Sequence, residues 1–442
     1  MTSSHNGLAE RDKKYLWHPF TPHQRWNAND PLVIEKGEGN FLVDDQGNRY
    51  LDAVSSLWTN VHGHNHPALN TAIQDQLSKI AHTTMLGLTH PTAIQLAKEL
   101  IDLAPDGLQR VFYSDSGSTA TEIAVKMAFQ TQQQRGHKHR TGFATLRDAY
   151  HGDTIGAVSV GGIDLFHEIF RPLLFPTVVL PAPVTPGGAE EQTCLEHALQ
   201  MLDEHSDTLA GLIIEPLVQG AAGMKMHSKA FINTLVQKAK AHGILVIVDE
   251  VAVGFGRTGT LFATEQLDFD PDFLCLAKGI SGGYLPLAAT LATEAIYDAF
   301  LGLPEEGKQF FHGHTYTGNP LACAVSLASL DLFRTERVLD HVAELSQVFT
   351  TELATLSSTP WIKQTRQCGV MIGIDLCAPD GSAAPPQTGH KVSMAARPLG
   401  AIFRPLGNTI VLNPPLSLTT TQATRLVDIA LEASRQVLEN LK

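Results

Sequence analysis

The pattern of apolar and polar positions predicts two kinds of structure along most of the chain. Residues 31–54 alternate apolar and polar positions and contain the turn-forming pairs Asp45-Gln46 and Gly47-Asn48, which is typical of an antiparallel β-meander. From about residue 66, helical periodicity alternates with short apolar runs. The helical stretches are 67–81, 90–104 and 119–134, and the strand-like runs are 110–115, 141–146, 209–216, 243–250 and 273–279. This alternation predicts a mainly parallel sheet wrapped by helices.

Two of the strand-like runs are apolar at nearly every position, as expected for strands that are covered on both faces. One run ends at Glu215 and the other at Asp249. Ligands bind outside the carboxyl ends of the strands in an open α/β sheet. We therefore expect both carboxylates to face the same crevice.

The C-terminal part has a different pattern. Residues 321–356 have the periodicity of one long helix, followed by a strand-like run at 369–376 and an amphipathic helix from Thr420. The stretch 377–390 is rich in Pro, Gly and Ala and is predicted to be a surface loop. We expect an α/β protein in three parts: an N-terminal segment that belongs to a small domain, a large domain and a C-terminal small α+β domain. Their expected bounds are 1–65, 66–330 and 331–442.

The composition narrows the class of protein. Of the 442 residues, 43% are hydrophobic and 17% are charged, which fits a folded protein and excludes a disordered or fibrous one. The formal net charge of -13 would repel nucleic acid and anionic membranes. Residues 1–14 lack the apolar core of a signal peptide, and no later apolar run is long enough to span a bilayer. Five scattered cysteines without a CxxC pair argue against disulfides and a zinc site. We expect a cytoplasmic protein with no nucleic acid, membrane or metal partner.

A turn of small residues after the run at 110–115 is the first candidate binding feature. Ser116, Gly117 and Ser118 lead into a strong helix, and the free N–H groups at the start of a helix suit a phosphate. When these residues are considered alone, an ordinary capped helix is the better explanation.

Asp249 and Lys278 are the strongest candidates for covalent chemistry. A buried carboxylate needs a partner, and the protonated ring nitrogen of pyridoxal-5'-phosphate (PLP) would supply one, although a capping Asp is equally possible from position alone. Lys278 follows an apolar run and precedes three glycines among the next five residues. Desolvation would lower the pKa of such an amine and favour the uncharged nucleophile, whereas a lone Lys is by default a solvated surface residue. The occurrence of these features together and in this order favours a PLP site.

Two weaker features fit the same hypothesis. Tyr150 precedes His151 and Gly152, and its ring could stack on a planar cofactor, although such a tyrosine is more often a simple core residue. Gly313 and Thr315 lie in a second turn of small residues before a helix, which is a further candidate phosphate site. Helix capping explains that turn equally well.

Six segments in a fixed order resemble the class III aminotransferases, which are PLP-dependent transferases of fold type I. The segments are SGS, YHGDTIGA, IIEPLVQG, VDEVAVGFGRTG, LAKGISGG and HTYTGNPLA. The match covers nearly the whole chain. The resemblance implies a mainly parallel seven-stranded sheet in a large PLP-binding domain, a smaller α+β domain, and a homodimer with both active sites at the interface.

The resemblance also implies roles around the cofactor. Lys278 is expected to form the Schiff base with PLP and to move the substrate proton, and Asp249 to hold the pyridine nitrogen. Gly117 and Ser118 are expected to bind the phosphate, with Thr315 reaching the phosphate of the neighbouring subunit's cofactor.

On the substrate side, the same resemblance implies that Tyr150 stacks on the cofactor ring and belongs to the catalytic residues. Trp58, Phe20 and Gly313 are expected to line the substrate pocket. Arg404 is expected to pair with the far carboxylate of the substrate, a role that suits a bidentate guanidinium.

Three further segments, 16–22, 55–67 and 403–416, resemble the members of this class that convert 8-amino-7-oxononanoate to 7,8-diaminononanoate in biotin synthesis. That resemblance implies S-adenosylmethionine as the amino donor. Phe20 stands where many of those members have tyrosine, and His314 stands where they often have proline, so lysine is an alternative donor. An ω-amino-acid or diamine:pyruvate transaminase with the same cofactor site is a second alternative, and a non-catalytic PLP-binding protein is a third.

Overall fold

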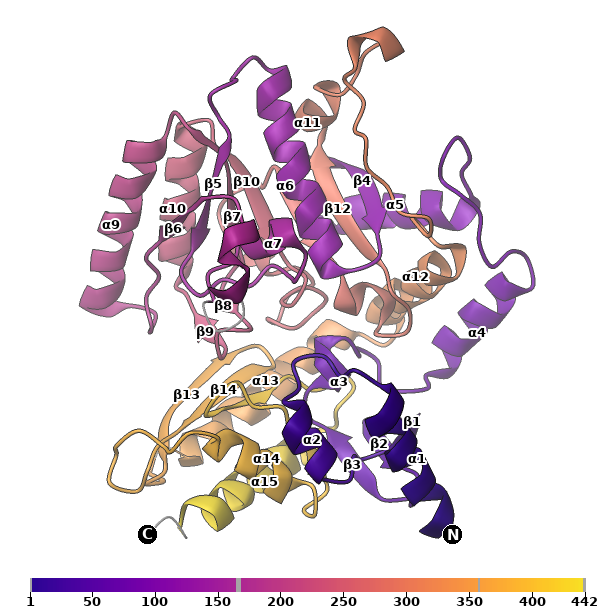
Figure 1. Cartoon of the computed structure of the whole chain (residues 1–442), viewed down its shortest axis with the longest axis vertical. Coiled ribbons are helices and arrows are strands. Elements are labelled where there is room, and N and C mark those ends of the chain that lie inside the picture. The colour runs from indigo at the N-terminus through magenta and orange to yellow at the C-terminus, as the bar shows by residue number, and fades with distance from the viewer. Residues whose placement is uncertain (1, 164–167, 357, 440–442) are drawn as a thin grey trace.

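The computed structural model describes residues 2–163, 168–356 and 358–439, and Figure 1 shows them arranged in two lobes. The upper lobe contains a sheet of seven strands in the order β4-β12-β11-β10-β7-β5-β6. Their bounds are Leu108–Ser114 (β4), Ala288–Thr293 (β12), Phe273–Leu276 (β11), Leu245–Asp249 (β10), Leu209–Ile214 (β7), Gly142–Leu146 (β5) and Thr177–Leu180 (β6). Only β12 runs antiparallel to its neighbours in this sheet, which confirms the expected mainly parallel α/β fold.

Helices cover both faces of this sheet, and the side chains of β10 show how. Leu245 and Ile247 point to one face, where they join a buried apolar cluster with residues of α6 (Gly117–Gln134). Val246 and Val248 point to the other face and join residues of α10 (Lys229–Ala241). Every residue of the strand is buried, because a strand between two helix layers has no solvent face. The other helices of this lobe are α4 (Pro67–Leu77), α5 (Pro91–Leu103), α7 (Ile155–Ser159), α9 (Gly188–His205), α11 (Glu294–Asp298) and α12 (Pro320–Thr335).

The lower lobe is built from both ends of the chain (Figure 1). The predicted N-terminal meander forms β1 (Ile34–Glu38), β2 (Phe41–Asp44) and β3 (Arg49–Asp52), and β3 pairs in parallel with β15 (Ala401–Ile402). A second sheet has the order β13-β14-β16. Its strands are Ile362–Cys368 (β13), Met371–Leu376 (β14) and Thr409–Leu412 (β16), and the helices of this lobe include α1 (Thr2–Tyr15), α2 (His23–Ala28), α13 (Val338–Leu356), α14 (Thr388–Ala396) and α15 (Thr420–Leu438).

Two predictions about the C-terminal part need correction. The single helix expected over 321–356 is two helices, α12 and α13, because Arg337 adopts a left-handed backbone conformation (φ 51°) that cannot continue a right-handed helix. The loop expected over 377–390 ends earlier, because α14 begins at Thr388, whose side chain is buried. The strands β6 and β12 were not predicted. The sequence of β12, AATLAT, has alanines, threonines and a single leucine and lacks a long apolar run.

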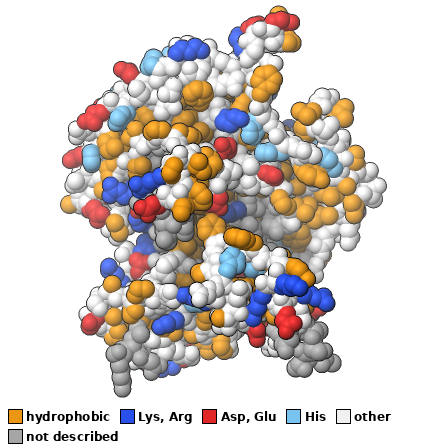
Figure 2. All heavy atoms as spheres, in the orientation of Figure 1, with side chains coloured by type: hydrophobic (Ala, Val, Ile, Leu, Met, Phe, Trp, Pro, Cys, Tyr) orange, Lys and Arg blue, Asp and Glu red, His pale blue; other side chains and the backbone are white. Residues whose placement is uncertain are grey.

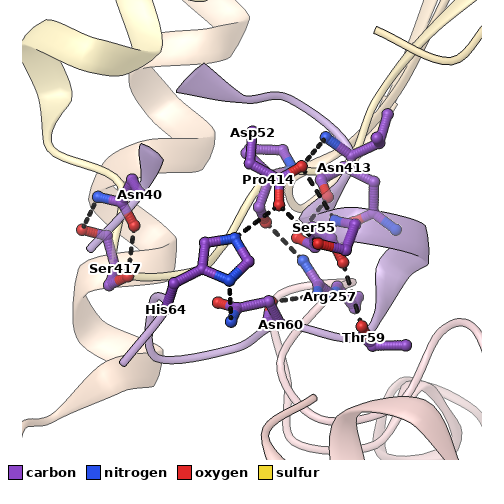
Figure 3. A network of polar contacts seen from close by, with 12 residues as sticks. Asn40, Asp52, Ser55, Thr59, Asn60, His64, Arg257, Asn413, Pro414 and Ser417 are labelled. Carbon is purple, nitrogen blue, oxygen red and sulfur yellow. Dashed lines mark hydrogen bonds and ion pairs between the residues drawn. The ribbon is translucent and has the colours of Figure 1, made fainter. Parts of the chain in front are cut away.

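The two lobes are joined by a buried polar network around Arg257 (Figure 3). Its guanidinium is almost fully buried and donates hydrogen bonds to the carbonyl oxygens of Asn60 (2.7 Å) and Pro414 (2.5 Å). Burial lowers the pKa of Arg257 to about 9. The Gly-rich loop after β10 is therefore tied to two loops of the other lobe. No helix in the described ranges is both long and apolar enough to cross a membrane.

Candidate active site

A cavity of about 780 Å³ lies at the carboxyl ends of β7, β10 and β11, where the two lobes meet. Glu215 and Asp249 both line this cavity, which confirms the prediction that they face one crevice. The cavity also brings together most of the candidate site residues from the sequence. These are Phe20, Trp58, Gly117, Ser118, Tyr150, Asp249, Lys278 and Arg404.

Gly313 and Thr315 are placed elsewhere. Among the described residues that line the cavity, neither appears. Both are exposed in the segment between a short 3₁₀ helix (Pro304–Glu306) and α12. Within a single chain, the structure therefore does not join them to the other candidate residues.

Lys278 lies two residues after the end of β11, in a backbone conformation that is strained for a non-glycine residue (φ 47°). Its Nζ atom lies 4.9 Å from the centroid of the Trp58 ring. Desolvation in the cavity lowers the pKa of Lys278 below its ordinary value, although the nearby carboxylates of Asp249 and Glu215 act in the opposite direction. The cavity thus favours the uncharged amine more than water does, as nucleophilic chemistry requires.

Asp249 ends β10 with a buried carboxylate that already has two partners. Its Oδ1 accepts a hydrogen bond from the backbone N–H of Val251 (3.0 Å), and its Oδ2 lies 2.7 Å from Nδ1 of His151. One carboxylate oxygen thus faces a backbone N–H donor and the other an imidazole. A carboxylate has about four lone-pair positions, so Asp249 can still accept a hydrogen bond from a protonated ring nitrogen.

His151 is the main residue that the sequence did not identify as functional. It is buried, and its Nε2 lies 3.5 Å from Oγ1 of Thr145 on β5. In the segment YHG, the sequence predicts a functional role for Tyr150 alone. A polar residue beside a predicted ring-stacking tyrosine was the available signal, but the partner is 98 residues away in the chain.

The start of α6 forms another part of the cavity wall. Ser116 caps the helix, and its Oγ accepts a hydrogen bond from the N–H of Thr119 (3.3 Å). Ser118 donates from Oγ to Thr154 (3.0 Å) and accepts from the N–H of Thr154 (2.9 Å). The helix is therefore capped, as the simpler reading of these residues proposed. Its first turn nevertheless lines the cavity at Gly117 and Ser118, where helix N–H groups and the helix dipole suit an anion.

Glu215 fixes two backbone segments at the cavity wall. Its Oε2 accepts from the N–H of Tyr150 (3.1 Å), and its Oε1 accepts from the N–H of Gly220 (3.1 Å). Burial raises the pKa of Glu215 to about 7. For Tyr150, burial and the neighbouring Asp153 raise the pKa of the phenol above its ordinary value, so the ring stays neutral near neutral pH.

Arg404 follows β15 and brings a positive charge to the cavity wall. In the described part of the chain, no hydrogen bond or ion pair of its guanidinium is found. Partial burial lowers the pKa of Arg404, with Tyr150 acting in the opposite direction. A guanidinium that lines a cavity without a carboxylate partner suits an anionic ligand.

These residues fit PLP. One cavity contains an amine of lowered pKa (Lys278), a buried carboxylate with spare acceptor capacity (Asp249) and a helix N-terminus that suits a phosphate (Gly117, Ser118). Each group matches a different part of that cofactor: the aldehyde, the ring nitrogen and the phosphate.

Comparison with known proteins identifies the family of the chain. Residues 23–433 match the family model described as aminotransferase class-III, so the chain belongs to that family, whose members depend on PLP. The chain is 47% identical to the adenosylmethionine-8-amino-7-oxononanoate aminotransferase of Geobacter sulfurreducens, over 95% of this chain and 96% of the relative. It is 45% identical to the protein of the same name from Aquifex aeolicus, over 95% of each chain.

Solved structures show the same fold. The crystal structure of the adenosylmethionine-8-amino-7-oxononanoate aminotransferase from Methanocaldococcus jannaschii has a TM-score of 0.94 and 42% identity, and covers 98% of this chain and 99% of its own. A PLP-bound amine transaminase from an uncultivated Pseudomonas species has a TM-score of 0.89 and 34% identity, with 96% and 99% covered. The fold is thus that of PLP-dependent transaminases.

Proposed function

We propose that this protein is a transaminase that converts 8-amino-7-oxononanoate to 7,8-diaminononanoate in biotin synthesis, with S-adenosylmethionine as the amino donor. The names of relatives that are 45–47% identical over nearly the whole chain support this substrate pair. The observation that carries the proposal is the guanidinium of Arg404, which lines the same cavity as the Lys278 amine. One cavity therefore offers a reactive amine and a cation for the far carboxylate of the oxononanoate.

PLP, when bound, supplies an electron sink and carries the amino group from the donor to the acceptor. Lys278 holds the cofactor through Nζ and, as a free amine of lowered pKa, accepts and returns the substrate proton. Asp249 binds the ring nitrogen, and the hydrogen bond with His151 holds the Asp249 carboxylate in place. Gly117 and Ser118 bind the phosphate through the start of α6.

Tyr150, Trp58 and Phe20 shape the space next to the cofactor. Tyr150 lines the cavity and would stack on the cofactor ring, while the indole of Trp58 and the ring of Phe20 would give an apolar path for the hydrocarbon chain of the oxononanoate. The apolar walls exclude water, which would compete for the reacting groups. Arg404 orients the substrate by its carboxylate, at the end of that chain.

The active unit is proposed to be a homodimer in the cytoplasm. Large apolar side chains are exposed around the loop after α4 and the segment that contains Thr315, and Figure 2 shows hydrophobic side chains gathered on that side of the molecule. Leu86 is 85% exposed and Phe311 is 77% exposed. Patches of this kind mark subunit interfaces. In the dimer, Gly313 and Thr315 of one chain complete the phosphate and substrate sites of the other.

The proposed domains are the N-terminal segment 1–65, the large PLP-binding domain 66–330 and the small domain 331–442. The pairing of β3 with β15 supports the assignment of the N-terminal segment to the small domain.

Lysine is the second candidate donor. Phe20 lines the cavity and has no hydroxyl group to bind a polar donor. Separate half-reactions test the choice: the purified PLP-loaded protein is mixed with S-adenosylmethionine or with lysine, and loss of the yellow cofactor colour is followed. We expect the faster loss with S-adenosylmethionine, and recovery of the colour on addition of 8-amino-7-oxononanoate. Faster loss with lysine would reassign the donor. Recovery with pyruvate but not with the oxononanoate, after loading with β-alanine or putrescine, would favour an ω-amino-acid or diamine transaminase.

A further inference from the structure

The short segment α3 (Ser55–Trp58), which carries Trp58 into the cavity, has an unusually strained backbone. Ser55, Ser56 and Trp58 all have left-handed φ values, of 50°, 62° and 63°. Three such residues within four positions, none of them glycine, are energetically unfavourable. Strain of this kind persists only where neighbouring groups fix the backbone, so the segment needs a set of contacts that holds it.

Asp52, at the end of β3, supplies the first of these contacts. Its carboxylate is fully buried, and Oδ1 accepts hydrogen bonds from the backbone N–H groups of Val54 (3.3 Å) and Ser56 (2.9 Å). Oδ2 accepts from the hydroxyl of Ser56 (3.2 Å). One carboxylate thus holds the start of the strained segment at three points.

His64 holds the carboxylate in turn. Its Nε2 lies 2.9 Å from Oδ2 of Asp52, and Figure 3 shows the ring between Asp52 and Asn60. With Nε2 as the N–H donor to Asp52, Nδ1 of His64 can accept from the side-chain amide of Asn60 (3.4 Å). The ring has little freedom, because a Cβ atom on Gly37 would lie only 2.4 Å from Cβ of His64.

Trp58 is also closely confined at the other end of the segment. Its ring lies over Nζ of Lys278, at 4.9 Å from the centroid. A Cβ atom on Gly220 would lie 2.9 Å from Cζ3 of the indole. The indole therefore fits between the reactive amine and the backbone of the cavity wall, and a small backbone change in α3 would move it.

We infer that Asp52 and His64 are positioning residues of the active site: they fix α3 so that the indole of Trp58 lies against the Lys278 amine and sets the width of the amine pocket. Neither Asp52 nor His64 is among the described residues that line the cavity, so both would act through Trp58. Only the kinetic test of this inference rests on the proposed function, because it measures the rate of the proposed reaction.

The test uses the full-length protein with 5-fluorotryptophan at its four tryptophans, and records ¹⁹F NMR spectra with and without PLP. Trp58→Phe assigns the Trp58 resonance. Asp52→Asn keeps one acceptor oxygen and removes the charge, and His64→Phe keeps a ring and removes the donor. We expect both substitutions to shift or broaden the Trp58 resonance and to leave those of Trp17, Trp26 and Trp361 unchanged.

Asp44→Asn is the matched control. Asp44 is also a buried carboxylate at a strand end, and it accepts from the N–H groups of Gln46 (3.0 Å) and Asn48 (2.8 Å), but it fixes a turn that does not carry Trp58. It should leave the Trp58 resonance in place, whatever its effect on stability. An unmoved Trp58 resonance in both Asp52→Asn and His64→Phe, or an equal shift in Asp44→Asn, would overturn the inference.

A double-mutant cycle gives the kinetic readout. In the native background, Asp52→Asn is expected to lower the rate constant of the donor half-reaction by about tenfold, because misplaced groups near the reacting atoms slow the reaction. In the Trp58→Ala background, the same substitution is expected to lower it by less than about twofold. Equal losses in both backgrounds would show that Asp52 does not act through Trp58. The spectra need no substrate. If the substitutions shift the Trp58 resonance as expected but the native protein does not aminate 8-amino-7-oxononanoate, the proposed function is wrong and the positioning role still holds.

Discussion

Nδ1 of His151 lies 2.7 Å from Oδ2 of Asp249, and both side chains are buried beside the Lys278 amine. The pair joins the carboxyl end of β10 to the loop after β5, which are separate in the chain. A donor on Oδ2 leaves the remaining lone pairs of Asp249 free for a ring nitrogen and fixes the direction in which they point. The carboxylate is therefore held in one orientation before the cofactor binds.

His151→Phe is expected to remove this donor while keeping a buried ring. A hydrogen bond to a charged group contributes about 1.5–3 kcal/mol, so kcat/KM should fall roughly 10- to 100-fold and PLP should bind more weakly. Steady-state kinetics and cofactor titration measure both effects. His151→Asn, which can still donate to Asp249, should recover part of the loss. Equal activity of His151→Phe and the native protein would show that the pair has no role in the reaction.

Arg404→Met is expected to raise the KM for 8-amino-7-oxononanoate by roughly 100-fold, because about 3 kcal/mol of charge-assisted hydrogen bonding to the carboxylate is lost. The methyl ester of the same substrate lacks that charge. The native protein should disfavour the ester by a similar factor, and Arg404→Met should hardly distinguish acid from ester. If the variant still prefers the acid as strongly as the native protein does, the carboxylate binds elsewhere.

Glu215 predicts a pH dependence of stability in the PLP-free protein. Burial raises the pKa of its carboxyl from 4.5 to about 7 in the folded state. Between these values the unfolded chain releases a proton that the folded protein keeps, so this group makes the free energy of unfolding fall as pH rises from about 4.5 to about 7, by roughly 3 kcal/mol at most. Urea unfolding at a series of pH values measures the slope.

In Glu215→Gln this contribution should vanish, and the stability curve should be flatter over the same pH range. Glu35→Gln, which changes an exposed carboxylate of β1, serves as the control and should keep the native slope. Parallel curves for Glu215→Gln and the native protein would mean that Glu215 is ionised throughout this range.

The fold follows from the sequence wherever one local pattern determines the element. Residues 244–248 are all apolar because β10 lies between two helix layers, and this run predicts both the strand and the position of Asp249 at its end. β12 was not predicted because its sequence has mostly small residues and threonines, although the strand is buried beneath α6 and pairs with β4 and β11. The break at Arg337 was not predicted because the apolar periodicity continues across it, although the backbone leaves the helical conformation there.

The site was predictable in its residue types and less so in its contacts. The position of Lys278 after an apolar run indicated a desolvated amine, which the structure places in the cavity. The His151–Asp249 contact joins residues that are 98 positions apart in the chain, so no local pattern predicts it. The roles proposed for Gly313 and Thr315 need a second chain and stay predictions.

The central claim is that the amine of Lys278 holds the cofactor and moves the proton. Lys278→Ala should bind PLP without the absorbance that the native protein gives with its covalently held cofactor, and should have no measurable turnover with any amino donor. Lys138→Ala, at an exposed lysine in the turn after α6, should keep both the absorbance and the activity. The direct measurement is the absorbance spectrum of PLP-loaded Lys278→Ala beside that of the native protein: the native band should be lost, and an unchanged band with full turnover would show that Lys278 neither holds the cofactor nor moves the proton.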